Sequence, residues 1–118
     1  MRILLAEDDP SIAAVEAELL AAVGHSVTLA STPARARALA RAQPWDVILA
    51  DMFGASYRGV QPSDRRFLRA MSASGPVIVV SARSWVAHAR PTELGVAAIV
   101  PKPFDPDDLL KAIRSARA

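Results

Sequence analysis

Five short apolar runs, rich in β-branched residues, alternate along the chain with stretches of helical periodicity. The runs cover residues 3–5, 27–29, 47–49, 77–80 and 97–100. They are continuously apolar, which is typical of strands buried on both faces of a parallel sheet. Parallel neighbours need helical crossovers, and these are almost always right-handed. The sequence therefore predicts an α/β fold, a doubly wound five-stranded parallel sheet with five helices.

The helical stretches carry start and stop signals. A capping residue followed by proline occurs at Asp9-Pro10, Thr32-Pro33 and Asp105-Pro106, and Gly24 stands where a helix would end. A third helix is predicted over 63–72. A fourth should begin near Ser84 and be short or kinked, because Pro91 falls inside it or at its end. The first helix should bury one apolar face, made of Ile12, Val15, Leu19, Leu20 and Val23.

Length and composition limit the class of protein. With 118 residues, 52% of them hydrophobic, the chain predicts one domain over 1–118 with its own core and no output domain. The absence of cysteine excludes disulfides, zinc–thiolate sites and cysteine nucleophiles. The first apolar run is too short for a signal peptide, and no run approaches the roughly 20 residues that span a bilayer. We expect a cytoplasmic protein without membrane insertion.

The charge pattern does not favour nucleic-acid binding. The net charge is +2, from 14 basic and 12 acidic residues, and the arginines recur in helical segments as on a solvated face. We therefore expect no direct contact with nucleic acid. We interpret His25 and His88 as surface residues, and Trp45 and Trp85 as packing residues.

Charged and polar residues directly follow four of the five predicted strands. They are Glu7, Asp8 and Asp9 after the first, Asp51 after the third, Ser81 after the fourth and Lys102 after the fifth. In open α/β sheets, ligands bind beyond the carboxyl ends of the strands. These side chains are therefore candidates for one site, with Asp9 open to two interpretations, a helix N-cap or a metal ligand.

Converging carboxylates repel one another unless a cation neutralises them. A set of oxygen ligands without histidine or cysteine favours Mg²⁺ or Mn²⁺ over zinc. We predict ligands from Glu7, Asp8, Asp51 and the backbone carbonyl of Phe53, with waters completing the shell. Such a cation would let the Asp51 carboxylate attack a phosphoryl group of like charge, with Lys102 as a point charge and Ser81 as a hydroxyl donor.

At these residues the chain resembles the CheY-like receiver domains of bacterial two-component response regulators. The resemblance extends from RILLAEDDP to PKPFDPDDLLKAI. It implies the flavodoxin-like strand order 2-1-3-4-5. It also implies an acidic pair at Glu7 and Asp8, a phosphoacceptor at Asp51, a hydroxyl residue at Ser81 and a Lys-Pro pair, usually joined by a cis peptide, at Lys102-Pro103.

Two departures from the family concern the transmission of the signal. The family's aromatic switch position is occupied here by Ile99, and the segment 52–62 lacks the common proline shortly after the acceptor. We therefore assign the switch region to Ser81, Ile99 and Pro103, and expect the segments 82–92 and 52–62 to carry the change. Trp85 should report it by fluorescence.

The resemblance implies a phosphoacceptor signalling protein, not an enzyme with a separate substrate. A sensor histidine kinase or a histidine phosphotransfer protein would phosphorylate Asp51, and Mg²⁺-dependent self-phosphorylation and autodephosphorylation are expected. The output would be altered docking to a downstream protein target. The main alternative is a pseudo-receiver that binds partners without phosphorylation. A flavodoxin-like cofactor domain and a haloacid-dehalogenase-like phosphatase fit less well, because EDDP would repel phosphate and no DxD motif follows the first strand.

Overall fold

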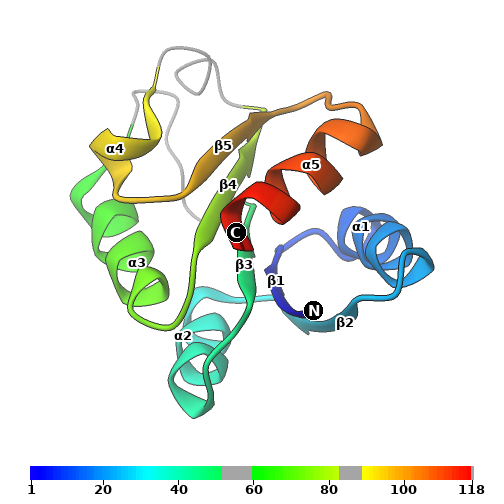
Figure 1. The fold of residues 1–118 in the computed structure, drawn as a ribbon. Helices are drawn as coiled ribbons and strands as arrows, with labels where there is room; N and C mark the ends of the chain where they lie inside the picture. Colours follow the sequence, from blue (N-terminus) through cyan, green and yellow to red (C-terminus); the bar gives the residue numbers. More distant parts are fainter. Residues whose placement is uncertain (52–59, 83–88, 118) are drawn as a thin grey trace.

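Five strands form one parallel sheet in the order β2-β1-β3-β4-β5 (Figure 1). This computed structural model describes residues 1–51, 60–82 and 89–117. The strands are β1 (Arg2–Ala6), β2 (Ser26–Ala30), β3 (Val47–Ala50), β4 (Val77–Ser81) and β5 (Ala98–Pro101). The predicted α/β class and strand order are both confirmed.

Helices cover both faces of the sheet (Figure 1). They are α1 (Pro10–Ala22), α2 (Pro33–Ala42), α3 (Pro62–Ser72), α4 (Pro91–Leu94) and α5 (Pro106–Arg117). Residues of α1 and α5 pack in one core, and residues of α2, α3 and α4 pack in the other. The first strand illustrates the division, because Ile3 and Leu5 point into the first core and Leu4 and Ala6 into the second. Burial on both faces explains why the strands read as continuous apolar runs.

The predicted capping residues act as caps. Asp9, Thr32 and Asp105 each accept hydrogen bonds from backbone N–H groups in the first turn of the following helix. Gly24 follows α1 with a φ of 92°, a left-handed conformation that favours glycine. Each of the five described helices begins at a proline, whose fixed φ suits the first helical position.

The predicted apolar face of α1 is correct only in part, because Leu20 is buried and Leu19 is half-buried against the core, whereas the other three residues are exposed. Val15 is 67% exposed, and Ile12 and Val23 are also exposed, whereas the buried residues of the helix are Ala13, Glu16 and Leu20. The helix carries apolar residues on two adjoining stripes, and periodicity selects the more hydrophobic one. In the folded chain, Glu16 faces Lys102, a lysine from the far end of the sequence.

The fourth helix also differs from its prediction. Its expected start at Ser84 lies outside the described residues, as do Trp85 and His88. The described helix α4 begins at Pro91 instead of ending or kinking there. A proline at the first helical position loses no intrahelical hydrogen bond, so it starts a helix as readily as it interrupts one. The third helix begins at Pro62, one residue before the predicted start.

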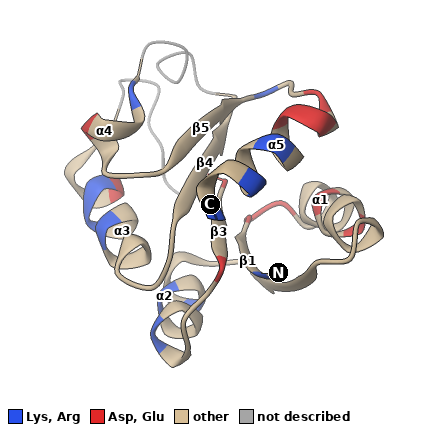
Figure 2. Cartoon of the chain, viewed as in Figure 1, with Lys and Arg blue, Asp and Glu red and all other residues tan. Residues whose placement is uncertain are grey.

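The arginines of α2 and α3 lie on the outer faces of their helices, as the sequence predicts (Figure 2). Arginines of α2 and α3, among them Arg35, Arg41, Arg65 and Arg69, are exposed on the outer faces of these helices. Arg37 is half-buried and lies over the ring of Phe67, 5.7 Å from its centroid. This is a solvated helix face with one packed side chain. None of the helices within the described ranges has the length and apolar character to cross a membrane.

Candidate functional site

The carboxyl ends of the strands bring four predicted residues to one edge of the sheet. Ala6 and Ala50 are register partners on β1 and β3, so Glu7 and Asp51, the next residues, leave the sheet side by side. The backbone continues the ladder beyond the strands, because the Asp51 N–H donates to the Ala6 carbonyl at 2.9 Å. In the same way, the Lys102 N–H donates to the Ser81 carbonyl at 2.9 Å. These two hydrogen bonds fix the backbone of Asp51 and Lys102 relative to the neighbouring strands.

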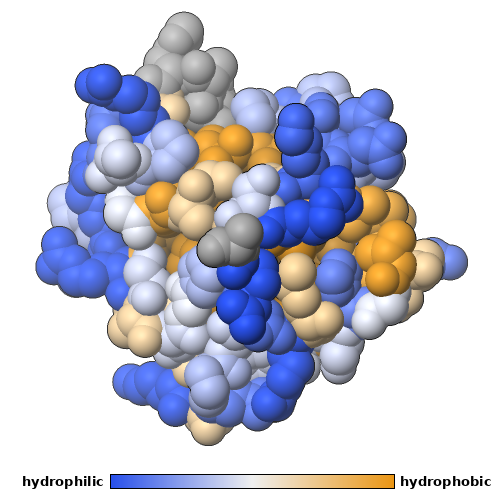
Figure 3. Space-filling view, viewed as in Figure 1, coloured by the Kyte–Doolittle hydropathy of each residue, from blue (hydrophilic) through white to orange (hydrophobic). Residues whose placement is uncertain are grey.

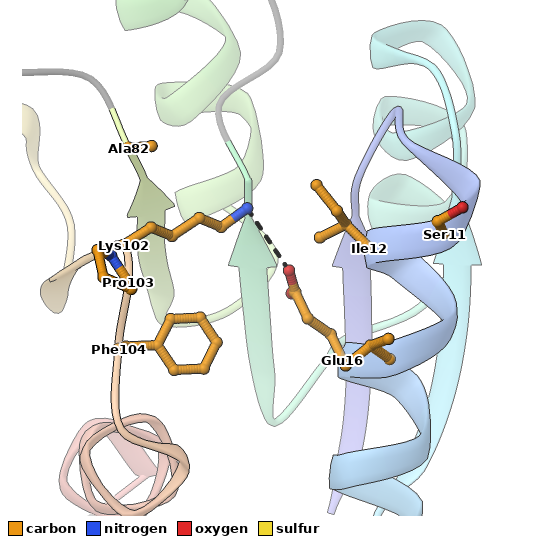
Figure 4. Close-up of a pocket in the computed structure, with 8 residues that line it drawn as sticks. Ser11, Ile12, Glu16, Ala82, Lys102, Pro103 and Phe104 are labelled. Carbon is orange, nitrogen blue, oxygen red and sulfur yellow. Dashed lines mark ion pairs between the residues drawn. The ribbon is translucent and has the colours of Figure 1, made fainter.

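Lys102 occupies the centre of an acidic cluster. Its ammonium donates a hydrogen bond to Asp51 Oδ2. The Nζ atom also lies 3.7 Å from Glu7 Oε2 and 3.8 Å from Glu16 Oε1. The contact with Glu16, a residue of α1, is drawn in Figure 4. One ammonium therefore bridges carboxylates from β1, β3 and α1.

Glu7 is almost fully enclosed, with 4% of its surface exposed. Its Oε1 atom accepts a hydrogen bond from the Asp9 N–H at 2.9 Å, but Oε2 has no hydrogen-bond partner among the described residues. Burial and the neighbouring Asp51 carboxylate raise the pKa of Glu7 to about 8, although the Asp9 hydrogen bond opposes the shift. A carboxylate in this condition is a favourable ligand for a cation.

Asp51 and Lys102 influence each other's protonation. Burial raises the pKa of Asp51, although the Lys102 ammonium opposes the increase. Burial alone would lower the pKa of Lys102, but the Asp51 hydrogen bond and the charges of Asp51, Glu16 and Glu7 outweigh it and raise that pKa. Lys102 therefore remains charged at neutral pH, and Asp51 remains close to a fixed positive charge.

The sequence analysis did not identify Glu16, which is the unexpected member of the cluster. It is 3% exposed, and burial raises the pKa of its carboxyl group while Asp51 and Lys102 oppose the shift. Carboxylate oxygens of Glu7, Glu16 and Asp51 all lie within 4.8 Å of one another. Glu16 lies at helical intervals from both Ala13 and Leu20, but this spacing singles it out only once these two positions are known to be buried.

The other two acids after β1 have different surroundings. Asp8 is exposed and is not part of the three-carboxylate cluster, although it lies near enough for its side chain to help raise the pKa of Glu7. Asp9 caps α1 by accepting hydrogen bonds from the N–H groups of Ser11 and Ile12, at 2.9 and 3.2 Å. The N-cap interpretation of Asp9 is confirmed.

The predicted hydroxyl and switch residues lie on β4, on β5 and just after β5. Ser81 is buried at the end of β4. Ile99 is half-buried on β5, opposite Val79, and packs against the core that includes α3. Pro103 is exposed, and the Lys102–Pro103 peptide bond is cis, as the resemblance implies. Phe53, the predicted source of a backbone carbonyl ligand, lies outside the described residues.

A shallow apolar groove adjoins the acidic cluster. It lies between the first turns of α1 and the segment that leads into α5, and its lining includes Ile12, Val15, Pro103 and Phe104 (Figure 4). Hydrophobic side chains are also visible at the surface on the α1 side of the molecule in Figure 3. The groove therefore places exposed apolar surface beside the Lys102 ammonium.

Comparison with known proteins identifies the family. The sequence matches the family described as "Response regulator receiver domain" over residues 3–114. The chain belongs to this family. It is a receiver domain of the two-component type, and the resemblance inferred from its motifs is confirmed.

Individual relatives are similar but distant. The chain is 30% identical over 122 residues to a DNA-binding transcriptional regulator NtrC of Bradyrhizobium, with 98% of the chain and 24% of that protein aligned. It thus spans about a quarter of that regulator's length. The receiver domain of a Francisella response regulator is 25% identical, with 98% and 95% of the two chains covered and a TM-score of 0.80.

A third relative was solved with a metal ion. The receiver domain of a Pseudomonas aeruginosa sensor histidine kinase is 24% identical, with coverage of 98% and 96% and a TM-score of 0.76. That structure holds a magnesium ion coordinated in its active-site cleft. At this level of identity the similarity establishes the shared fold.

Proposed function

We propose that Asp51 accepts a phosphoryl group from a phosphohistidine of a sensor kinase or a histidine phosphotransfer protein. The observation that carries the proposal is the convergence of Lys102, Glu7 and Asp51 at the carboxyl edge of the sheet. Asp51 remains partly accessible, with 11% of its side chain exposed, so an incoming group can reach it from the open edge. Family membership supports the same role.

The reaction moves a phosphoryl group between two protein side chains. A carboxylate oxygen of Asp51 forms a bond to phosphorus as the bond between phosphorus and the histidine nitrogen breaks. The electron pair of the broken bond returns to the imidazole, which takes up a proton, and Asp51 becomes an acyl phosphate. Lys102, which contacts Asp51, supplies positive charge to the phosphoryl oxygens. Ser81 supplies a hydroxyl group from the next strand.

The residues also fit a divalent cation. Glu7, Asp8 and Asp51 would hold Mg²⁺ or Mn²⁺ together with the backbone carbonyl of Phe53. The fit rests on a buried Glu7 oxygen without a hydrogen-bond partner among the described residues and on a donor set made only of oxygens. When bound, the ion neutralises negative charge on the carboxylates and the phosphoryl group. The magnesium ion of the Pseudomonas relative supports this assignment.

The output of the domain is contact with other proteins. We propose that phosphorylation changes the docking of a downstream protein target through Ser81 and the neighbouring switch residues Ile99 and Pro103. The exposed groove at Ile12 and Val15 is the surface from which a phosphodonor protein reaches Asp51. We propose no direct contact with nucleic acid, since the exposed arginines of the described helices are spread over α2, α3 and α5 and form no single stripe.

Small-molecule phosphodonors test the central step without a partner. The protein is incubated with phosphoramidate and Mg²⁺ or Mn²⁺, and its intact mass is measured. We expect one added phosphoryl group, which should be absent when a chelator replaces the metal and absent in Asp51→Asn. Asp107→Asn, which changes an exposed aspartate at the start of α5, is the matched control and should be phosphorylated normally. Failure of the wild-type protein to gain mass would favour the pseudo-receiver alternative, which Ile99 at the switch position also favours.

A further inference from the structure

Glu16 is a buried acid whose carboxylate lacks hydrogen bonds. It lies in the middle of α1 and points toward the carboxyl edge of the sheet (Figure 4). Neither Oε1 nor Oε2 accepts a hydrogen bond from any described residue, and its side chain is only 4% exposed. A buried ionised carboxylate is costly unless it is paired and hydrogen-bonded. In its ionised form, Glu16 therefore needs a compensating charge.

Lys102 supplies only part of that compensation. The ammonium donates a hydrogen bond to Asp51 and lies 3.8 Å from Glu16 Oε1, which is too far for a good hydrogen bond. Among the described residues, it is the only cation within ion-pair distance of Glu7, Glu16 and Asp51. With all three ionised, the cluster carries three negative charges against one positive charge. A divalent cation would balance the remaining two.

The spacing of the three carboxylates also suits one ion. Their nearest oxygens lie within 4.8 Å of one another. Opposite ligands of an octahedral Mg²⁺ or Mn²⁺ site are about 4.2 Å apart, twice the ligand distance of about 2.1 Å. Adjacent ligands of such a site are about 3.0 Å apart, so side-chain movements of about 1–2 Å, with the Lys102 ammonium withdrawn from between the carboxylates, would bring all three onto a single ion.

We propose that Glu16 is a further direct ligand of the divalent cation at this site, contributed by helix α1. The chain would then hold the ion with a carboxylate in addition to those at the ends of β1 and β3. This inference deepens the proposed function, because the ion is the one that serves phosphorylation of Asp51. The added carboxylate makes the cation site tighter than one built from the strand ends alone.

Direct measurement of Mn²⁺ binding tests the role of Glu16 without any phosphodonor. Free Mn²⁺ is counted by electron paramagnetic resonance during titration of wild-type protein, Glu16→Gln, Glu16→Asp and Glu18→Gln. Glu16→Asp keeps the charge but shortens the side chain by one methylene, about 1.5 Å, so it separates direct ligation from long-range attraction. Glu18, two residues along α1, is exposed and is the matched control.

We expect Kd for Mn²⁺ to rise about tenfold or more in both Glu16 variants and to change less than about twofold in Glu18→Gln. Circular dichroism and urea unfolding without metal establish that each variant is folded. If Glu16→Asp does not fold, a loss of affinity in Glu16→Gln that exceeds the loss in Glu18→Gln carries the test. Wild-type affinity in Glu16→Asp would overturn direct ligation, and so would the absence of Mn²⁺ binding by the wild-type protein at millimolar concentration.

The two proposals fail in different ways. If the Glu16 variants lose Mn²⁺ affinity but the wild-type protein gains no phosphoryl mass from phosphoramidate, the proposed function fails and the ligand assignment stands. If the wild-type protein is phosphorylated and Glu16→Asp binds Mn²⁺ normally, the ligand assignment fails alone.

Discussion

Lys102, at the end of β5, donates a hydrogen bond to Asp51, at the end of β3, across the intervening strand β4. The contact joins the proposed phosphoacceptor to the one cation that the described part of the site provides. Because the ammonium also approaches Glu7 and Glu16, its compact shape matters as much as its charge. A change at Lys102 therefore tests the geometry of the whole cluster.

Lys102→Arg should behave as a non-conservative change. The planar guanidinium is wider than an ammonium and cannot occupy the same point between three carboxylates. We expect the rate of phosphorylation by phosphoramidate to fall at least tenfold, measured by intact mass over time. Lys111→Arg, a change at the exposed lysine of α5, is the matched control and should keep the wild-type rate. An unchanged rate in Lys102→Arg would show that this lysine is not part of the reacting site.

Asp8 should contribute to metal affinity but little to metal-free stability. It is exposed, so its charge is already solvated, unlike those of Glu7 and Glu16. We expect Asp8→Asn to raise the Mg²⁺ concentration needed for half-maximal phosphorylation, while its free energy of unfolding without metal changes by less than about 0.5 kcal/mol. Normal phosphorylation at limiting Mg²⁺ would remove Asp8 from the proposed ligand set.

The strands were predictable because each of the central ones is buried on both faces. Residues 3–6 of β1 and Val47–Ala50 of β3 are all buried, and such runs need no knowledge of the tertiary fold to be recognised. The face of α1 was not predictable in this way. The helix turns Ala13, Glu16 and Leu20 inward, with Glu16 3.8 Å from Lys102, and periodicity contains no information about a contact so distant in sequence.

The site residues likewise fall into those that the sequence predicts and those that it does not. Glu7, Asp51 and Lys102 were predictable because a strand end fixes the edge of the sheet at which a side chain emerges. Glu16 was not, since it lies in the middle of a helix, where a charged residue is usually solvated. The position after the strand end also made Asp8 and Glu7 equally good candidates for metal ligands, whereas the structure buries Glu7 and exposes Asp8. Alternation of side chains beyond the strand end separates these two neighbours.

Because of the orientation of α1, substitutions at Leu20 and Val15 should have different effects on the free energy of unfolding. Leu20 is fully buried, whereas Val15 is 67% exposed. We expect Leu20→Ala to lower the free energy of unfolding by about 2–5 kcal/mol, because it removes buried methyl groups and leaves a cavity. Val15→Ala should change it by less than about 0.5 kcal/mol. Urea unfolding measures both values. A larger cost at Val15 would mean that Val15 is buried in solution and that the helix is rotated relative to this structure.

The two tryptophans should respond differently to a phosphoryl mimic. Trp45 is 5% exposed, and its Nε1 donates a hydrogen bond to the Leu39 carbonyl at 3.0 Å. It precedes β3, at the opposite end of that strand from Asp51. We expect beryllofluoride with Mg²⁺ to change the fluorescence of Trp45→Phe, which keeps Trp85, but not that of Trp85→Phe. The opposite result would contradict a switch that runs through the segment 82–92.

The buried acids should make stability without metal depend on pH. The pKa of Glu7 is about 8 in the folded protein, against an ordinary value of 4.5, and burial raises the pKa values of Glu16 and Asp51 in the same direction. Between these values the folded protein binds more protons than the unfolded chain. The contribution of these groups to the free energy of unfolding is therefore fully present below about pH 4.5 and is lost as the pH rises toward 8. We expect the free energy of unfolding, measured in urea with a chelator, to decrease across this interval.

Two changes, the substitution Glu7→Gln and the addition of Mg²⁺, should make the free energy of unfolding depend less on pH. Glu7→Gln removes the carboxyl group whose pKa is raised to about 8, so the decrease from pH 5 to 8 should become smaller. Glu18→Gln, at an exposed position, should leave it unchanged. Saturating Mg²⁺ should also reduce the decrease, because an ion bound by ionised carboxylates stabilises the folded protein more as the pH rises. A slope that is equal in wild-type protein and Glu7→Gln would show that Glu7 is already ionised throughout this range.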